Sequence, residues 1–320
     1  MKLALKMNDL GIVNMHLGFQ IDYLNDQYTR VKIHQTTYCR KMIARYGFAD
    51  CAHVSTPTKP GLTIAKGTGT PLGIEGSSRY RKMTGAVMWP ACLTRYDFIF
   101  VAVFLAQFMN APTVEAMEAM VHLFKYIAHH LDIGITYDST GVKTFHIVGF
   151  TDASYANATN YRTVGGYCFF ASTGLVSYKV RREHSVVLST AEGELVFFCD
   201  GTKEAVFIRS LLGEIGYLGA GATLVFCDNK ATIAIVMNDG ASQRTKHIDI
   251  RKFFVREKVA RRYVDIQYCH TQAMLADLMT KVHDIERHQK LVAIIGNFND
   301  HWVVIKASIK TKNKDVKFKV

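Results

Sequence analysis

Apolar residues recur along this chain with two spacings, one typical of helices and one typical of strands. Between 80 and 131 they return every three or four residues, as at Ile99, Val103 and Ala106, and this pattern predicts three helices. From 144 to 151 they alternate with other residues, which predicts a strand. The change of spacing predicts that a second domain begins near residue 140.

The segments before residue 58 and after residue 144 each contain both spacings, and we expect both strands and helices in them. Before residue 58 we expect strands at 16–23 and 28–34, a turn at Asn25-Asp26 and a helix at 37–45. After 144 we expect further strands at 165–171, 175–179, 222–227 and 264–268, and helices at 189–216, 230–237, 247–262 and 273–282. Antiparallel strands followed by alternating helices and strands predict a mixed α/β sheet.

Turn-forming residues suggest where these parts divide. Seven Pro and Gly residues fall between 55 and 73, a density typical of a linker or long loop. The expected division is 1–58, a linker at 59–79, a helical segment at 80–140, an α/β domain at 144–283 and a tail at 284–320. The tail ends in a lysine-rich stretch at 306–320, and we expect this stretch to be solvated.

Composition and charge narrow the function. Hydrophobic residues make up 49% of the 320 residues, which excludes wholesale disorder, and the apolar runs are too short to cross a membrane. Lys and Arg number 39 against 27 Asp and Glu, so the formal charge of +12 favours a polyanionic partner, above all nucleic acid. No secretion signal is readable and the seven cysteines are scattered singly, which predicts a cytoplasmic or nuclear protein that is not secreted.

Four carboxylates occupy positions from which they could converge. Asp152 ends the strand that places Val148 and Phe150 on the same face, and Asp228 follows a later strand. Glu194 continues the buried stripe of the long helix, whereas Glu192 is offset by about 200° and is expected to point outward. Asp277 lies in the last expected helix.

An acid on a buried face is costly unless a cation compensates its charge, and a divalent metal ion is one such cation. Two magnesium ions about 3.5–4 Å apart can activate water and stabilise the leaving oxygen of a phosphodiester. The alternative is that these are ordinary acids at strand ends and on a helix surface, and the residues alone leave both interpretations open.

Several short motifs, in this order and spacing, resemble the carboxyl-terminal portion of copia-type retrotransposon Pol polyproteins. The resemblance covers roughly residues 5–283. The matching motifs are Met7-Asn8-Asp9-Leu10-Gly11, Thr94-Arg95-Tyr96-Asp97, Thr151-Asp152-Ala153-Ser154-Tyr155-Ala156, Ser189-Thr190-Ala191-Glu192-Gly193-Glu194, Cys227-Asp228-Asn229, Arg244-Thr245-Lys246-His247-Ile248-Asp249 and Ala276-Asp277-Leu278-Met279-Thr280-Lys281.

The resemblance implies a ribonuclease H-like domain, with flanking helices on a mixed sheet, preceded by a smaller α+β remnant of reverse transcriptase (late palm, thumb and connection). The family's metal-binding acids fall on Asp152, Glu194, Asp228 and Asp277. The implied reaction is hydrolysis of the RNA strand of an RNA/DNA hybrid with two Mg²⁺ ions, for which Mn²⁺ can substitute. Implied partners are the hybrid or another nucleic acid, and upstream polymerase and integrase portions of a polyprotein.

Departures from the family pattern leave an alternative open. The paired-aspartate signature of the polymerase does not occur in this chain, so DNA synthesis is not expected from it. Tyr178, Tyr96 and Met274 replace the usual Trp, Pro and Gln, which is typical of a divergent copy. The alternative function is therefore a catalytically inactive, nucleic-acid-binding remnant, while an integrase-like strand transferase is disfavoured by the order of the acids.

A basic helix is expected to supply the contact with nucleic acid. Between 244 and 262 eight basic residues stand against Asp249 and Glu257, with Phe253 and Phe254 expected to face inward. Phosphate contacts of this kind give sequence-independent, salt-sensitive affinity. The candidate phosphate-binding residues are Arg244, Lys246, Arg251, Lys252 and Arg256. The alternative is an ordinary solvated helix face.

Overall fold

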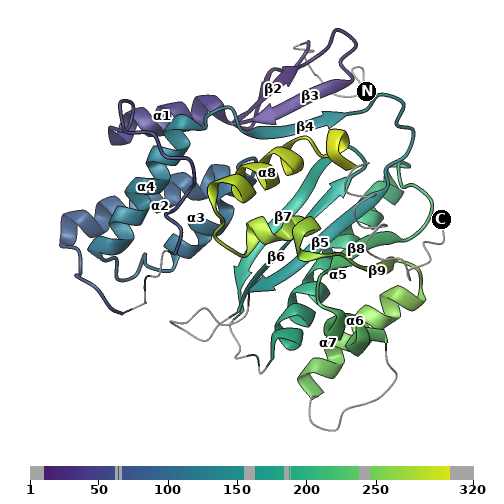
Figure 1. Ribbon diagram of the computed structural model, residues 1–320. Helices are drawn as coiled ribbons and strands as arrows, with labels where there is room; N and C mark the ends of the chain where they lie inside the picture. Colours follow the sequence, from purple (N-terminus) through teal and green to yellow (C-terminus); the bar gives the residue numbers. More distant parts are fainter. Residues whose placement is uncertain are drawn as a thin grey trace, which may run out of the picture.

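The computed structural model describes residues 11–61, 64, 67–154, 163–183, 187, 189–237 and 246–302, with the side chains of 246–249 left out. This part of the chain contains two sheets, one of four strands and one of five. Helix α8 (Ile285–Gly296) lies between the sheets, and the helices of the amino-terminal part gather on one side (Figure 1). None of the described helices is long and apolar enough to span a membrane.

The amino-terminal part combines the smaller sheet with a group of helices. Its elements are β1 (Met15–His16), β2 (Phe19–Tyr23), β3 (Arg30–His34), α1 (Thr36–Tyr46), α2 (Ile74–Ala91), η1 (Tyr96–Phe98), α3 (Ile99–Ala106), α4 (Val114–His129) and β4 (Gly134–Asp138). The three helices predicted between 80 and 131 are present as α2, α3 and α4. However, α2 begins at Ile74, inside the stretch that was predicted to be a loop.

Two turns connect the first three strands of the smaller sheet. The Asn25 side chain accepts hydrogen bonds from the backbone N–H groups of Thr29 and Arg30 at 3.0 and 3.2 Å, and these bonds form the predicted turn between β2 and β3. The strand expected at 16–23 is interrupted, because Leu17 and Gly18 adopt positive φ angles and form a turn between β1 and β2. β4 then returns from α4 and pairs antiparallel with β3.

The larger sheet has the strand order β7-β6-β5-β8-β9. Its strands are β5 (Ile147–Ser154), β6 (Val164–Ala171), β7 (Gly174–Arg182), β8 (Thr223–Cys227) and β9 (Val264–Tyr268). β5, β6 and β7 pair antiparallel, whereas β8 and β9 run parallel to β5. This order and these directions are those of a ribonuclease H-like mixed sheet, as predicted.

Three helices lie on one face of this sheet. α5 (Thr190–Glu214) packs directly on β5 and β6, and α6 (Lys230–Met237) and α7 (Lys246–Ala260) pack against α5 (Figure 1). The Ser189 hydroxyl accepts from the Glu192 N–H at 3.1 Å and begins α5 where the sequence predicted. Gly201 lets α5 approach β5, since a Cβ there would lie 2.5 Å from Cγ2 of Thr151.

Helix α8 occupies the first part of the segment 284–320, which was predicted to be a basic tail. Asp284 caps the helix through the Arg287 N–H at 2.8 Å, and Leu291, Ile295 and Phe298 are buried. Leu291 and Ile295, one helical turn apart, give α8 an apolar face that packs against β4 and β7. The lysine-rich stretch after 305 lies outside the described residues.

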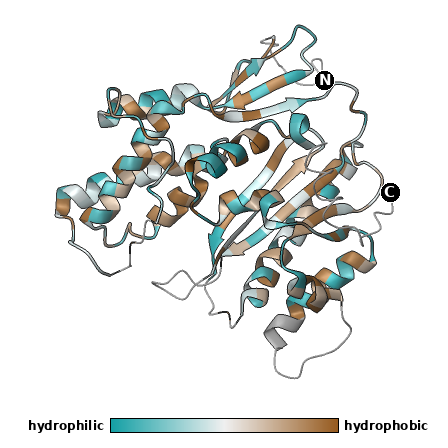
Figure 2. Cartoon of the chain, in the orientation of Figure 1, coloured by the Kyte–Doolittle hydropathy of each residue, from teal (hydrophilic) through white to brown (hydrophobic). Residues whose placement is uncertain are grey.

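A shared core joins the two parts. Tyr96 of η1 donates a hydrogen bond to the backbone oxygen of Val292 in α8 at 2.9 Å, and Tyr178 of β7 donates to that of Ala91 in α2 at 2.8 Å. Hydrophobic residues colour α3 and much of the central strands, where these elements pack (Figure 2). Because this core is continuous, the division into separate domains stays a prediction.

Candidate metal centre

Three carboxylates from three different elements meet at one end of the larger sheet. Asp152 lies near the end of β5, Glu194 in the second turn of α5, and Asp228 directly after β8. One ligand oxygen from each lies within 4.8 Å of the other two. Among the described residues this is the group of acids arranged to share a cation, and it contains three of the four acids predicted from the sequence.

The pKa of Glu194 is raised further than that of Asp152. The Glu194 side chain is 4% exposed, and its Oε2 atom has no hydrogen-bond partner. Burial, together with the charges of Asp152 and Asp228, raises the pKa of Glu194 to about 9, although a hydrogen bond from the Ala153 backbone opposes the shift. Without a compensating cation, Glu194 is therefore protonated at neutral pH.

Asp152 is buried as well, but it has partners. Its Oδ2 accepts a hydrogen bond from the Thr280 hydroxyl and lies 3.3 Å from Nζ of Lys281. Burial raises the pKa of Asp152 to about 6 against the opposing charge of Lys281, and the charge of Asp277 raises it further. Asp228 is less enclosed, and its Oδ2 accepts from the Thr271 hydroxyl at 2.8 Å.

Asp277, the fourth predicted acid, is held by basic side chains. Its Oδ1 lies 2.7 Å from Nζ of Lys281, and its Oδ2 lies 3.2 Å from an Arg287 nitrogen. The helix expected at 273–282 is wrong, because Asp277 belongs to a 3₁₀ segment, η3 (Leu275–Met279), that follows another, η2 (Thr271–Ala273). Every residue of η3 is buried, so the segment has no polar face of the kind that a surface helix presents.

Glu192 does not point outward as predicted, since its side chain is only 4% exposed. The first turn of α5 is enclosed on several sides: Thr232 of α6 donates to the Ala191 oxygen at 3.1 Å, and Thr163 and Val187 pack beside Gly193. Sequence periodicity identifies the face of a helix that meets the sheet, but it cannot show that other segments cover the opposite face.

A divalent ion fits the three-carboxylate group. Carboxylate oxygens are the donors that Mg²⁺ and Mn²⁺ prefer, and the unpartnered Oε2 of Glu194 is a buried polar atom that such an ion would satisfy. Three acids at this separation repel one another when ionised, and a cation between them would remove that penalty. Asp152, Glu194 and Asp228 are thus the residues that could hold a metal.

Lys281, Thr280 and Arg287 contribute to the centre and were given no role from the sequence. Lys281 follows Asp277 by four residues, a spacing that could have indicated the ion pair. Arg287 comes from the start of α8, which was expected to be part of a tail. No local pattern pointed to Arg287, because only the packing of α8 brings it to Asp277.

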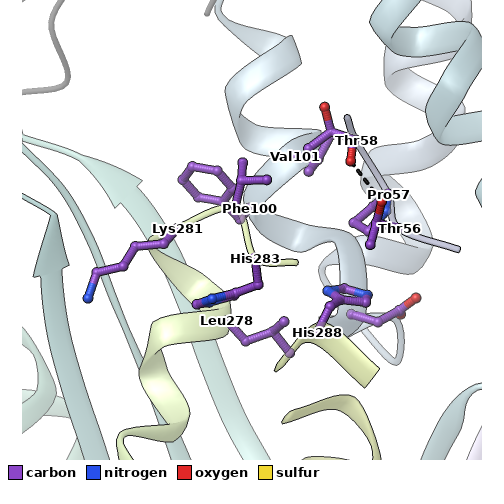
Figure 3. A pocket seen from close by; sticks show the side chains of 11 residues that line it. Thr56, Pro57, Thr58, Phe100, Val101, Leu278, Lys281, His283 and His288 are labelled. Carbon is purple, nitrogen blue, oxygen red and sulfur yellow. Dashed lines mark hydrogen bonds between the residues drawn. The ribbon is translucent and has the colours of Figure 1, made fainter. Parts of the chain in front are cut away.

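A small pocket lies behind η3, between it and the amino-terminal helices. Thr56, Pro57 and Thr58 line one side, and His283 and His288 line the other (Figure 3). The Lys281 side chain extends away from the rest of the labelled side chains (Figure 3), so its ammonium group reaches the carboxylates rather than the pocket.

The predicted basic helix is present as α7, but its residues are distributed differently from expectation. Lys252 is buried, with 5% of its surface exposed, whereas Arg251 and Arg256 are half-buried. Phe253 is 49% exposed, and Val255 instead of Phe253 faces the core. Arg244 and the side chain of Lys246 lie outside the described residues.

The sheet and the three-acid group together define a ribonuclease H-like fold with a candidate metal centre, and sequence comparison adds a relationship. The chain is 27% identical over 299 residues, 91% of its length, to the retrovirus-related Pol polyprotein from transposon TNT 1-94 of Nicotiana tabacum. It is 27% identical over 84% of its length to the corresponding polyprotein from transposon RE1 of Arabidopsis thaliana. These similarities confirm the resemblance to copia-type retrotransposon Pol polyproteins.

The chain spans about a fifth of the length of these relatives, 22% and 18% respectively. No protein-family model matches it. Among solved structures it is similar to RNase H1 from Halobacterium salinarum NRC-1, with a TM-score of 0.33, 9% identity, and coverage of 42% of this chain and 94% of that one. It is also similar to the foamy viral protease-reverse transcriptase dRH in complex with double-stranded DNA, with a TM-score of 0.44, 11% identity, and coverage of 81% of this chain and 38% of that one.

Proposed function

We propose that this chain is the ribonuclease H portion of a retroelement polyprotein and hydrolyses the RNA strand of RNA/DNA hybrids with divalent metal ions. The observation that carries the proposal is the convergence of Asp152, Glu194 and Asp228, with the unpartnered Oε2 of Glu194 among them. Support also comes from the similarity to retrotransposon Pol polyproteins over most of the chain.

The chain's own residues would act by holding charge in a fixed geometry. Asp152, Glu194 and Asp228 would ligate a divalent ion, and the resemblance adds Asp277 and a second ion. When bound, such ions polarise the phosphodiester and lower the pKa of water. Asp152 is fixed by Thr280, and Asp228 by Thr271, so both carboxylates are oriented before substrate arrives. Arg251 and Arg256 of α7 are the described candidates for phosphate contact.

A hybrid-cleavage assay tests this function. Purified protein should cut the RNA strand of a labelled RNA/DNA hybrid with Mg²⁺ or Mn²⁺ and stop when the metal is chelated. Asp152→Asn should lower the rate by at least about a hundredfold, because a ligand charge is lost. Asp132→Asn, at an exposed position, should leave the rate unchanged.

Single-stranded RNA is the control for a contaminating ribonuclease, which would cut it without metal. Intact hybrid after incubation of wild-type protein with either metal would refute the nuclease. A hybrid that is bound with a steep salt dependence but never cut would instead support the inactive binding remnant. One observation favours this second candidate: both carboxylate oxygens of Asp277 are already paired with basic side chains, Lys281 and Arg287, instead of being open to a metal ion.

A further inference from the structure

We propose that the ammonium group of Lys281 is the second cation of this centre, so that the carboxylates take one divalent ion per chain instead of two. This inference rests on the proposed function and specifies how its metal site is completed. It follows from the contacts of Asp152, which belongs to the three-acid group and is also an ion-pair partner of Lys281.

Lys281 occupies the position between Asp152 and Asp277. Its Nζ lies 3.3 Å from Oδ2 of Asp152 and 2.7 Å from Oδ1 of Asp277. A second metal ion that used Asp277 as a ligand would have to share these oxygens with the ammonium. Like charges at this separation repel strongly in a partly buried site, so an ion could enter only if Lys281 left.

The carboxylates on the two sides of Asp152 differ in their basic partners. On the side of Asp277, the negative charges of Asp152 and Asp277 are balanced by Lys281 and Arg287. On the other side, no basic side chain of the described residues forms an ion pair with Glu194 or Asp228, and Oε2 of Glu194 has no hydrogen-bond partner. A divalent ion thus finds an open set of ligands on the Glu194 side and a neutralised pair on the Asp277 side.

The backbone holds Lys281 in this place. The backbone N–H groups of Thr280 and Lys281 both donate to the backbone carbonyl oxygen of Asp277 at 3.1 Å, and the Thr280 hydroxyl donates to Oδ2 of Asp152. The side chain, 36% exposed, extends from this turn away from the pocket behind it (Figure 3). Its positive charge is therefore held at the carboxylates of Asp152 and Asp277.

Counting bound Mn²⁺ on the full chain tests the inference without relying on activity. Electron paramagnetic resonance of free Mn²⁺ gives the number of ions bound, with and without a hybrid whose 2′-O-methyl RNA strand resists cleavage. Wild-type protein should bind one ion per chain in both conditions. Lys281→Met, a neutral side chain of similar length, should bind two and give the spectrum of a spin-coupled pair.

Lys290→Met is the matched control, because Lys290 is exposed on α8, and it should bind one ion. Two ions per wild-type chain with the hybrid would overturn the inference even if Lys281→Met failed to fold, and hybrid cleavage by the same protein would leave the proposed function standing. One ion in both the wild type and Lys281→Met would also overturn it. No bound ion in the wild type would overturn the proposed function together with the inference.

Discussion

Arg95 and Asp97 form a fully buried, bidentate ion pair at the start of η1. Nε and Nη2 of Arg95 each lie 2.8 Å from one oxygen of Asp97, and both side chains are at most 1% exposed. The guanidinium carbon also lies 4.9 Å from the centre of the Phe98 ring. Both residues belong to one of the motifs on which the resemblance to retrotransposon polyproteins was based, and their burial indicates that this motif stabilises the fold.

Removing one partner of this pair should be costly. Asp97→Ala leaves the Arg95 charge buried and unpaired, so we expect the free energy of unfolding to fall by about 3–5 kcal/mol, measured by urea denaturation. Asp50→Ala, at an exposed position, should change it by less than about 0.5 kcal/mol. Equal effects of the two substitutions would contradict the structural role of the pair.

Stability should depend on pH through His288. Burial lowers the pKa of His288 to about 4 from 6.5, and its Nε2 lies 3.0 Å from the Tyr126 hydroxyl. Because the unfolded chain binds the proton more tightly, the contribution of His288 is present above pH 6.5 and is lost as the pH falls toward 4.

The expected loss over this window is roughly 2–3 kcal/mol, measured by thermal or urea unfolding between pH 4 and 7. His288→Gln keeps a polar group beside Tyr126 and should flatten the pH dependence. His146→Gln, at an exposed position, is the control and should retain the wild-type slope. An unchanged slope in His288→Gln would show that other groups cause the acid sensitivity.

Glu194 should make the metal-free protein less stable as the pH rises. Its folded pKa of about 9 lies above the unfolded value of 4.5, so its stabilising contribution is present below pH 4.5 and is lost as the pH rises toward 9. The slope contributed within that window approaches about 1.4 kcal/mol per pH unit.

Unfolding measured between pH 6 and 9 in a chelator should show this slope in the wild type and a smaller one in Glu194→Gln. Added Mg²⁺ should reduce the wild-type slope, because the ion stabilises the ionised carboxylate, and should have little effect on the variant. A slope that is equal in both proteins would contradict the burial of an unpaired Glu194.

Close packing between α5 and β5 should control the geometry of the three acids. In Gly201→Ala the new methyl group would meet Cγ2 of Thr151 at 2.5 Å, so α5 must shift and move Glu194 relative to Asp152. We expect a loss of about 1–3 kcal/mol in stability, measured by urea denaturation, and weaker Mn²⁺ binding.

Gly213→Ala offers the same substitution in the same helix with no atom closer than 4.0 Å. It should stabilise the protein by about 0.5–1 kcal/mol, since alanine favours the helix, and leave Mn²⁺ binding unchanged. Unchanged metal binding in Gly201→Ala would show that the acids tolerate movement of α5.

Local patterns in the sequence were sufficient for most of the ribonuclease H-like sheet. Alternation and β-branched residues predicted the strand at 264–268 with its observed bounds, and the helix at 230–237 is likewise as predicted. Ser189 began the long helix as expected, because an N-cap depends only on residues within one turn. Period-two and period-3.6 phasing also selected Asp152, Glu194 and Asp228, which the fold then brings together.

What the sequence determined by itself was therefore the type of most elements, although not of 273–282 or of α8, and the positions of Asp152, Glu194 and Asp228 within their elements, because these follow from neighbours a few residues away. Only the tertiary structure decided that β4 pairs with β3, that Glu192 is covered, and that Arg287 and Lys281 neutralise Asp277. These features depend on which distant segments pack against one another, and the charge around a carboxylate is the sum of all the groups that packing brings near it.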